Sequence, residues 1–329
     1  MMKRLRAGII GCGMISKMFH VPAMTHIPEI KLEAFSDVNR EWANELASRY
    51  SAPYSFTDYN EMLGKIDMVV VATPNALHAN ISKVFLDAGI HVLCEKPMGI
   101  NVEECEDVLK KETESNAIFM VGHSRRFASN AMLLKEFHEK GMFGEIKSME
   151  LVMGHSHTQW ITRSGFSFKK ELSGGGVLID QGIHLIDLLI WFSPGQITVT
   201  SSVGKDILGH GMEDHAEIEF SLLNGGKATI KTSRTEEWDN LCTLEGTKGW
   251  AKFHIDDKSF LKICSENLRG CRKLRYLQIK TGLNNIYLDQ IKYFVNCINN
   301  KVSPMTSADS SVKGIRLLKE CYAKMSIIK

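Results

Sequence analysis

The alternation of short apolar runs with longer amphipathic stretches in the first 122 residues restricts the fold more than any other feature. Five runs have the length and β-branched content of strands: "RAGIIG", "KLEAFSDV", "IDMVVVAT", "HVLCEK" and "AIFMVG". Helical patterns near residues 14–27, 39–49, 76–88 and 101–115 separate them. Continuous apolar strands that alternate with helices are typical of a parallel sheet covered on both faces. We therefore predict a doubly wound α/β domain over residues 1–122.

The pattern changes after a predicted helix near residues 128–140. From "EIKSMELVMGHS" through "HAEIEFSLL", "KATIKTSR", "LCTLEG" and "WAKFHI", apolar and polar residues alternate. A period of two indicates strands with one buried and one open face. For residues 123–329 we therefore predict an α+β domain around a large, mostly antiparallel open sheet. An apolar helix between residues 174 and 192 interrupts this sheet, and helices near 285–300 and 308–325 close it.

The charges exclude two classes of partner. The 40 Lys and Arg residues are nearly balanced by 38 Asp and Glu residues, and both signs are scattered along the chain. The sequence has neither a basic stripe for nucleic acid nor a polybasic patch for a membrane surface. We expect a small neutral or mildly anionic ligand, no nucleic acid and no membrane.

Several features favour a cytoplasmic location. The eight cysteines contain no CxxC pair, and a chain of 329 residues does not need disulfides to fold. The apolar run in "MMKRLRAGIIGCG" stops at glycines, so it lacks the apolar core of a signal peptide. The apolar helix between residues 174 and 192 spans roughly 16 residues, which is short of the ~20 that cross a bilayer. We therefore expect a protein of the reducing cytoplasm.

The turn "AGIIGCGMIS" follows the first predicted strand and precedes a helix. Gly11 and Gly13 match a dinucleotide-binding fingerprint, in which the first glycine permits a tight turn and the second lets a pyrophosphate approach the backbone. Ser16 stands where the fingerprint has Gly or Ala, and it is still small enough for close packing. The residues of the turn predicted to bind the cofactor are Gly11, Cys12, Gly13, Met14 and Ile15.

Asp37 ends the second predicted strand, "AFSD". An acid there accepts hydrogen bonds from the adenosine ribose hydroxyls and repels a 2′-phosphate, which favours NAD over NADP. Arg40 lies close by and could soften that preference, so both residues are cofactor candidates and NADP stays open. The alternative is that Asp37 only caps the helix that begins near Asn39, and the two roles are compatible.

The predicted strand "IDMVVVAT" leads into "VATPNALH", where a ligand would lie across the carboxyl edge of the sheet. Thr73, Pro74 and Asn75 are predicted to line the nicotinamide half of the cofactor, although Pro and Asn are also ordinary turn residues. His78 is either a further cofactor contact or only the first residue of the next helix.

The predicted strand "HVLCEK" ends at "LCEKPMG". Pro97 disfavours helical geometry at Lys96, so the lysine is held extended beside the predicted nicotinamide position. Glu95, next to it, is a cofactor candidate. Lys96 is suited to proton transfer, and the alternative is a salt bridge with Glu95 or another acid.

The stretch "GGGVLIDQGIHLIDLLIWF" is an apolar helix with three titratable groups. Asp180, His184 and Asp187 recur at spacings of four and three, which places them on one stripe of the helix. The glycines 174–176 fit a close backbone approach, which would let substrate or nicotinamide lie over the helix amino terminus.

These motifs occur in a fixed order: the glycine fingerprint, "ATPNALH", "EKP", "VGHSRRF" and "GGGVLIDQGIH". The ordered set, from Ala7 to about Phe192, resembles the glucose-fructose oxidoreductase, inositol dehydrogenase and MocA family (Gfo/Idh/MocA). The resemblance implies an amino-terminal Rossmann domain and a carboxyl-terminal antiparallel sheet, with the active site between them. It also implies oxidation of a secondary alcohol of a sugar or polyol, or reduction of the ketone, with NAD(H) or NADP(H).

The same resemblance implies that Lys96, Asp180 and His184 are the catalytic lysine, aspartate and histidine. His184 is the natural general base near neutral pH. Lys96 would hydrogen-bond the same substrate oxygen, and Asp180 would hold the hydroxyl or tune the other two. Whether Lys96 or His184 takes the proton stays open. Asp187 is predicted to be structural.

Two further segments supply candidates. The family's segment at Arg125 and Arg126 borders cofactor and substrate, so Arg125 is a cofactor candidate and Arg126 a substrate candidate, although one arginine could instead pin the two domains. The loop "HSHTQWITRSGFSFKK" adds three substrate candidates, His155, Trp160 and Arg163. His155 and His157 would share one face of a strand, but no third ligand is evident, and we expect no metal.

Three functions are consistent with these residues. The first is an NAD(P)-dependent dehydrogenase for the CH–OH groups of a sugar or polyol, of the inositol type or a sugar 3-dehydrogenase or ketoreductase. The second is an NAD-binding regulatory or sensor protein of the same fold, and the third is an NAD-retaining glycosidase. An exposed face on the carboxyl-terminal sheet would suit a homodimer or homotetramer.

Overall fold

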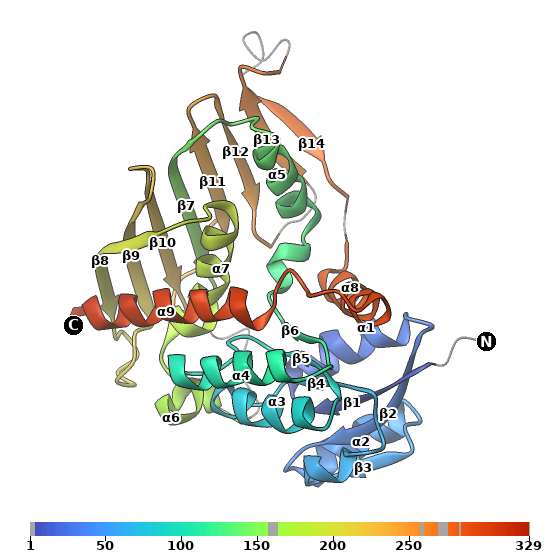
Figure 1. Ribbon diagram of the computed structural model, residues 1–329. Coiled ribbons are helices and arrows are strands. Elements are labelled where there is room, and N and C mark those ends of the chain that lie inside the picture. Colours follow the sequence, from blue (N-terminus) through green and yellow to red (C-terminus); the bar gives the residue numbers. More distant parts are fainter. Residues whose placement is uncertain (1–3, 157–163, 257–259, 269–275, 283, 329) are drawn as a thin grey trace. The chain divides into compact units, whose positions relative to one another are not determined.

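The computed structural model describes residues 4–156, 164–256, 260–268, 276–282 and 284–328 (Figure 1). The chain divides into two compact units. Unit 1 comprises Met1–His123, Thr162–Gly174 and Asn285–Ile315, and unit 2 comprises Ser124–Ile161, Gly175–Asn284 and Arg316–Lys329. Each unit contains one sheet. The domain limits 1–122 and 123–329 concern contiguous stretches of sequence, and they stay a prediction.

Unit 1 contains a six-stranded sheet with the order β3-β2-β1-β4-β5-β6, in which all neighbouring strands are parallel. The strand order reverses between β1 and β4, the place where doubly wound sheets bind ligands. The predicted parallel sheet is confirmed, and only the short β3 was not expected from the sequence. The strands are β1 (Leu5–Ile10), β2 (Ile30–Ser36), β3 (Tyr54–Phe56), β4 (Met68–Val71), β5 (His91–Cys94) and β6 (Phe119–Val121).

The helices of unit 1 lie where the sequence predicted them, except for the short α6, which was not expected. Asparagine side chains start three of them: Asn39 accepts from the amides of Glu41 and Trp42, Asn101 from that of Glu104, and Asn285 from those of Tyr287 and Leu288. A π-helical turn, Ser16–His20, leads into the first helix. The helices are α1 (Val21–Thr25), α2 (Arg40–Arg49), α3 (His78–Asp87), α4 (Val102–Glu114), α6 (Lys170–Ser173), α8 (Ile286–Asn300) and the first part of α9 (Ala308–Lys324).

Unit 2 contains a nine-stranded sheet with the order β14-β13-β12-β11-β7-β10-β9-β8-β15. Its neighbours are antiparallel except for the pairs β7–β10 and β8–β15, so the predicted mostly antiparallel sheet is confirmed. The strands are β7 (Ile146–Gly154), β8 (Ile197–Lys205), β9 (His215–Leu222), β10 (Lys227–Ser233), β11 (Leu241–Gly246), β12 (Gly249–His254), β13 (Phe260–Ser265), β14 (Leu277–Lys280) and β15 (Ser326–Ile328).

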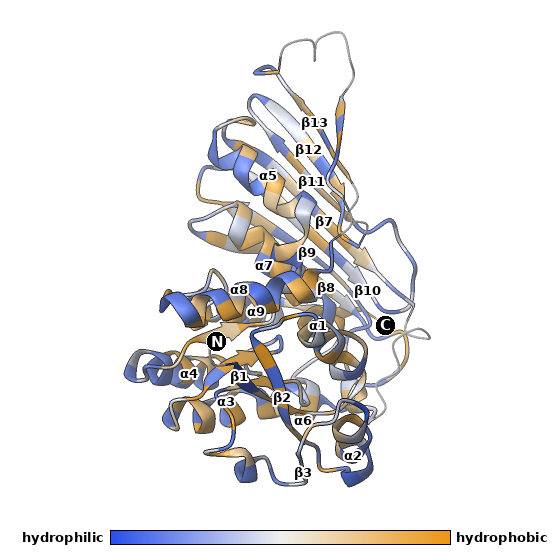
Figure 2. Cartoon of the chain, turned by 90° about the vertical axis from the view of Figure 1, so that its right-hand side faces the viewer, coloured by the Kyte–Doolittle hydropathy of each residue, from blue (hydrophilic) through white to orange (hydrophobic). Residues whose placement is uncertain are grey.

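One face of this sheet is buried and the other is open. Buried residues alternate with exposed or half-buried ones along β9 and β11, and Figure 2 shows the matching alternation of apolar and polar residues in the strands. Helix α5 (Ser129–Glu139) contacts β12 and β13, and α7 (Ile183–Phe192) contacts β7 and β10. The sheet and these helices therefore form the core of unit 2.

The apolar helical run is longer than the sequence predicted. Among the described residues, Lys170–Phe192 is long and apolar enough to cross a bilayer by length and composition alone, but 72% of its apolar window is buried within the protein. Such burial is typical of a core helix in a folded domain.

Candidate functional site

The glycine turn after β1 has one closed and one open position. Gly11 has a φ of +90°, and a Cβ there would collide with the carbonyl oxygen of Ala72, so only glycine fits. Around Gly13, no described heavy atom beyond its chain neighbours lies within 4 Å of the position that a Cβ would take. The turn therefore fits a dinucleotide: its backbone is tightly bent at Gly11 and accessible at Gly13.

Ser16 closes this turn from the helix side. Its hydroxyl donates to the carbonyl of Gly11 at 2.5 Å, and Ser16 is fully buried. The departure from the usual Gly or Ala thus adds a small hydroxyl that hydrogen-bonds inside the turn. Ser16 also begins the π-helical turn that leads into α1.

Asp37 is tied to the glycine turn rather than acting as the helix cap. One carboxylate oxygen accepts from the amide of Cys12 at 2.7 Å, and the other accepts from the amide of Asn39 at 2.8 Å. The side chain that caps α2 is that of Asn39. Asp37 therefore lies at the carboxyl end of β2 beside the turn, with the exposed Arg40 three residues further on.

His78 joins the two turns that follow β4 and β5. It is buried, and its ring nitrogens lie 2.7 Å from the carbonyl oxygen of Pro97 and 2.8 Å from that of Thr73. Burial lowers the pKa of His78, and the two carbonyls oppose that shift. The nearby Asn75 is also buried and donates to the carbonyl of Ser173 at 2.8 Å. These polar contacts fix the carboxyl edge of the sheet.

Glu95 has a buried histidine partner. Its Oε1 lies 2.6 Å from Nε2 of His20, and its Oε2 accepts from the amide of Lys96 at 3.2 Å. Burial alone would raise the pKa of the Glu95 carboxyl, but the hydrogen bond and charge of His20, with the charges of Lys96 and His78, hold it below its usual value. Lys96 itself is half-buried and precedes a cis bond to Pro97.

In unit 2, the helix that carries Asp180 and His184 begins with a second π-helical turn, Leu178–Gly182. Such a turn closes i→i+5 instead of i→i+4 and is frequent at functional sites. The stripe expected from an α-helical period is therefore altered within this turn. Asp180 and His184 are half-buried, whereas Asp187 is 4% exposed.

Asp187 and Arg126 form a buried ion pair. The guanidinium donates through Nε at 2.8 Å and through Nη2 at 2.7 Å to the two carboxylate oxygens, and both side chains are 4% exposed. Two parallel charge-assisted hydrogen bonds fix both planes. This pair supports the structural role predicted for Asp187, and it commits the guanidinium of Arg126 to that carboxylate.

The start of this helix is filled by protein groups, which corrects the expectation that substrate or nicotinamide lies over it. The buried carboxylate of Glu213 accepts from the amides of Gly176 at 3.3 Å and Leu178 at 3.0 Å. Its backbone carbonyl accepts from Val177 at 2.8 Å. The hydroxyl of Tyr322 accepts from the amide of Ile179 at 3.2 Å and donates to Glu213 at 2.8 Å. The glycines do permit a close approach, but the approaching groups belong to the chain itself.

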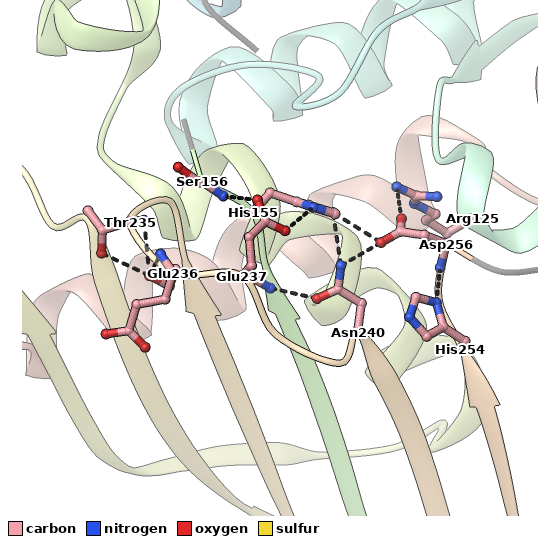
Figure 3. A network of polar contacts seen from close by, with 11 residues as sticks. Arg125, His155, Ser156, Thr235, Glu236, Glu237, Asn240, His254 and Asp256 are labelled. Atoms are coloured by element: carbon pink, nitrogen blue, oxygen red, sulfur yellow. Dashed lines mark hydrogen bonds and ion pairs between the residues drawn. The ribbon is translucent and has the colours of Figure 1, made fainter. Parts of the chain in front are cut away.

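Arg125 and His155 converge on one carboxylate, that of Asp256 (Figure 3). Arg125 Nη2 lies 2.7 Å from Oδ1, and His155 Nε2 lies 3.0 Å from Oδ2. Asn240 donates to the same Oδ2 at 2.5 Å and accepts from the amide of Gly154 at 2.8 Å. The two predicted ligand-binding side chains thus share a polar network at the ends of β7 and β12.

The network shifts two pKa values in opposite directions. Burial alone would raise the pKa of Asp256, but the hydrogen bond from His155, the charge of Arg125 and the hydrogen bond from Asn240 hold it well below its usual value. The hydrogen bond to Asp256 raises the pKa of His155 against the effect of burial. Both shifts favour the charged pair.

Three predicted residues, His157, Trp160 and Arg163, lie outside the described residues. Within the described ranges, no group of three or more His, Cys, Asp or Glu side chains is arranged to hold a metal ion. Glu213, Tyr322 and Asp256 were not singled out from the sequence. No local motif marks them, because each acts on residues far away in the chain.

Comparison with known proteins gives the family. The model of the oxidoreductase family with an NAD-binding Rossmann fold (GFO_IDH_MocA) matches residues 5–123, and the GFO/IDH/MocA C-terminal domain matches residues 132–252. The chain is 30% identical to the D-glucoside 3-dehydrogenase of Escherichia coli over 249 residues, which is 70% of each chain. It is 29% identical to the inositol 2-dehydrogenase of Rhizobium meliloti over 255 residues, which is 74% of each.

A solved structure supports the fold along nearly all of the chain. Levoglucosan dehydrogenase in complex with NADH and levoglucosan matches with a TM-score of 0.90 at 20% identity, covering 98% of this chain and 97% of the other. The chain therefore belongs to the Gfo/Idh/MocA oxidoreductase family, and its amino-terminal part is an NAD-binding Rossmann fold. The predicted resemblance and fold class are confirmed.

Proposed function

We propose that the protein is an NAD(P)-dependent dehydrogenase that interconverts a secondary alcohol of a sugar, sugar derivative or polyol with the corresponding ketone. The observation that carries this proposal is the complete set Lys96, Asp180 and His184 on the family's motifs, in a chain whose glycine turn fits a dinucleotide. A protein that only sensed NAD would not need three titratable groups suited to handling a carbinol proton.

NAD is the preferred cofactor in this proposal. When bound, it supplies the hydride acceptor for the carbinol carbon. The turn at Gly11 and Gly13 would hold the pyrophosphate, and Asp37 would accept from the ribose hydroxyls while repelling a 2′-phosphate. The position of Asp37 beside Cys12 supports this assignment. Thr73, Pro74, Asn75 and His78 would form the nicotinamide side of the same sheet edge.

The chain's own residues would transfer the hydroxyl proton of the substrate. His184 would accept the hydroxyl proton in the oxidation and return it in the reduction. Lys96 would donate a hydrogen bond to the substrate oxygen and stabilise the negative charge that develops there. Asp180 would hold the hydroxyl or orient the two nitrogen bases. The ion pair of Arg126 and Asp187 supports a rigid helix behind them.

The class of substrate is supported by the relatives, whose names include a glucoside 3-dehydrogenase, an inositol dehydrogenase and a levoglucosan dehydrogenase. All three act on cyclic compounds rich in secondary hydroxyls. His155, Trp160 and Arg163 stay candidates for substrate contact. We also propose a homodimer or homotetramer that uses the open sheet face, and a cytoplasmic location, which the seven described free cysteines support.

The test is a redox assay over a substrate panel. The purified protein is incubated with NAD or NADP and with myo-inositol, levoglucosan, methyl β-glucoside or glucose 6-phosphate, and NAD(P)H is followed by absorbance. We expect reduction of NAD with at least one polyol or sugar, followed by identification of the keto product. NAD binding with no redox change on any alcohol or ketone would contradict the proposal and favour a sensor. Glycoside cleavage without net NADH would favour the NAD-retaining glycosidase.

A further inference from the structure

Glu213 and Tyr322 together hold the backbone that directly precedes Asp180. Four consecutive amides, those of residues 176–179, donate to oxygen atoms of these two residues. Glu213 lies two residues before β9 and is 3% exposed, and Tyr322 lies in the last turns of α9. The two side chains are themselves joined by the 2.8 Å hydrogen bond from the Tyr322 hydroxyl to Glu213 Oε1.

The glycines of the motif make room for this pair. A Cβ on Gly175 would collide with the Tyr322 hydroxyl, and a Cβ on Gly176 would collide with the carbonyl oxygen of Glu213. Two of the three glycines are thus accounted for by contacts inside unit 2. Their function is to admit a carboxylate and a phenol from distant parts of the chain.

We propose that Glu213 and Tyr322 are positioning residues that hold the π-helical turn Leu178–Gly182 and thereby set the relative direction of Asp180 and His184. The effect that we expect on turnover rests on the proposed function. Its structural content, the restraint of residues 176–180 by this pair, is independent of the substrate.

The π-turn explains why such restraint is needed. A π-turn contains one residue more than an α-turn, and it is the rarer and less stable geometry. Relaxation to an α-turn would shift the phase of Asp180 relative to His184 by about one residue, roughly 100° around the helix axis. Hydrogen bonds to the amides of Leu178 and Ile179 fix the first residues of the turn, on the amino-terminal side of Asp180.

The chemistry of the pair indicates more than an ordinary helix cap. A Ser, Thr, Asp or Asn at the helix start would satisfy the same amides locally. Here the acceptor is a buried carboxylate, and burial raises the pKa of Glu213 against its hydrogen bonds from Tyr322 and Leu178. Burial and the charge of Glu213 also raise the pKa of Tyr322. A buried polar network whose groups are hydrogen-bonded rigidifies the backbone that it holds.

The test uses Tyr322→Phe, Glu213→Gln and Glu213→Ala in the full chain. Tyr322→Phe removes one hydroxyl without changing the shape, and Glu213→Gln keeps one acceptor oxygen. We expect kcat for the best panel substrate to fall about tenfold in Tyr322→Phe and roughly 100-fold in Glu213→Ala, with KM and the Kd for NAD unchanged. Glu213→Gln should lie between wild type and Glu213→Ala, as expected for rescue by the conservative variant.

Tyr293→Phe is the matched control. The Tyr293 hydroxyl also accepts from a backbone amide, that of Met305 at 3.0 Å, but it belongs to unit 1, whereas the helix of Asp180 belongs to unit 2. Tyr293→Phe should lose a similar amount of thermal stability and keep full kcat. If Tyr322→Phe lowers kcat no more than Tyr293→Phe, the pair is only structural and the positioning role is wrong.

Amide hydrogen exchange separates this proposal from the proposed function. In wild type, the amides of residues 176–179 should exchange slowly, and in Tyr322→Phe their exchange should accelerate about tenfold while that of β7 and β10 is unchanged. If exchange is faster in Tyr322→Phe but the wild type turns over no substrate, the proposed restraint by the pair is supported and the proposed dehydrogenase function is refuted. Unchanged exchange in both Tyr322→Phe and Glu213→Ala would overturn the restraint itself.

Discussion

Two glycine-rich helix starts, at Gly11–Gly13 and at residues 174–176, have opposite surroundings. Both precede a π-helical turn, Ser16–His20 in one case and Leu178–Gly182 in the other. At Gly13 the space beside the backbone is open, whereas at Gly176 it is filled by Glu213. An exposed helix amino terminus attracts anions, but a buried carboxylate can take the same amides. A glycine-rich helix start therefore indicates a ligand site only when no distant residue fills it.

The largest expected difference between the two helix starts is the effect of replacing a glycine by alanine. Gly176→Ala drives a Cβ into the carbonyl of Glu213, and we expect destabilisation by about 3 kcal/mol or more, with little folded protein. Gly13→Ala should change the free energy of unfolding by less than about 1 kcal/mol while weakening NAD binding at least ~tenfold. Thermal unfolding and NAD titration measure both. Equal destabilisation by the two substitutions would show that both starts are packed alike.

The open start should be selective because of Asp37. Asp37→Asn keeps an acceptor for the amide of Cys12 but removes the negative charge, so the preference for NAD over NADP should fall about tenfold, or ~1.4 kcal/mol. Arg40→Ala is the control with the opposite sign, since it should weaken NADP binding alone. Titration with both dinucleotides gives the ratio. A ratio unchanged by Asp37→Asn would mean that this carboxylate does not face the ribose.

The smallest expected effect concerns Asp256. Its carboxylate is paired with cationic side chains, whereas the carboxylate of Glu213 accepts hydrogen bonds from amides and a hydroxyl. The lowered pKa of Asp256 contributes stability above about pH 4, which is lost as the pH falls through its folded value. The raised pKa of His155 contributes stability below about pH 6.5, which is lost as the pH rises through its folded value. The pair is therefore strongest between these limits.

Asp256→Asn should lower the Tm by about 2–4 °C near pH 5.5, and by less near pH 9, where His155 loses its charge. Thermal unfolding at the two pH values measures the difference. Glu237→Gln is the control, because its carboxylate lies 3.7 Å from His155 and is 51% exposed, so it should change the Tm very little. A loss that is greater at pH 9 than at pH 5.5 would contradict this reading of the network.

The difference between the two helix starts also shows how far the sequence could predict the molecule. The turn at Gly11 depends on residues close in the chain and on the regular order of a doubly wound sheet, so its geometry and the position of Asp37 were predictable. Glu213 contacts Gly176 across 37 residues, and Tyr322 contacts Ile179 across 143. No periodicity links such partners, since their pairing follows from the tertiary fold. The π-turns were not predicted either, because the apolar pattern was interpreted with an α-helical period throughout.

The Rossmann sheet and the open sheet were predicted because buried and half-buried strands differ in their residue pattern. The partners of Arg125, Arg126 and His155 were not, because a cationic side chain suits a ligand and a buried carboxylate equally well. The structural role of Asp187, by contrast, was predicted from its position one turn beyond His184. Its ion pair with Arg126 supports that reading.

The most direct test of the central claim is isotope transfer. The protein is incubated with NAD and the active polyol or sugar carrying deuterium at its carbinol carbons, and the reduced cofactor is analysed by mass spectrometry for wild type and Lys96→Ala. We predict that wild type yields deuterated NADH, and that Lys96→Ala binds NAD normally but forms it about 10³-fold more slowly. No deuterium in the cofactor, or undiminished transfer by Lys96→Ala, would contradict direct hydride transfer assisted by Lys96.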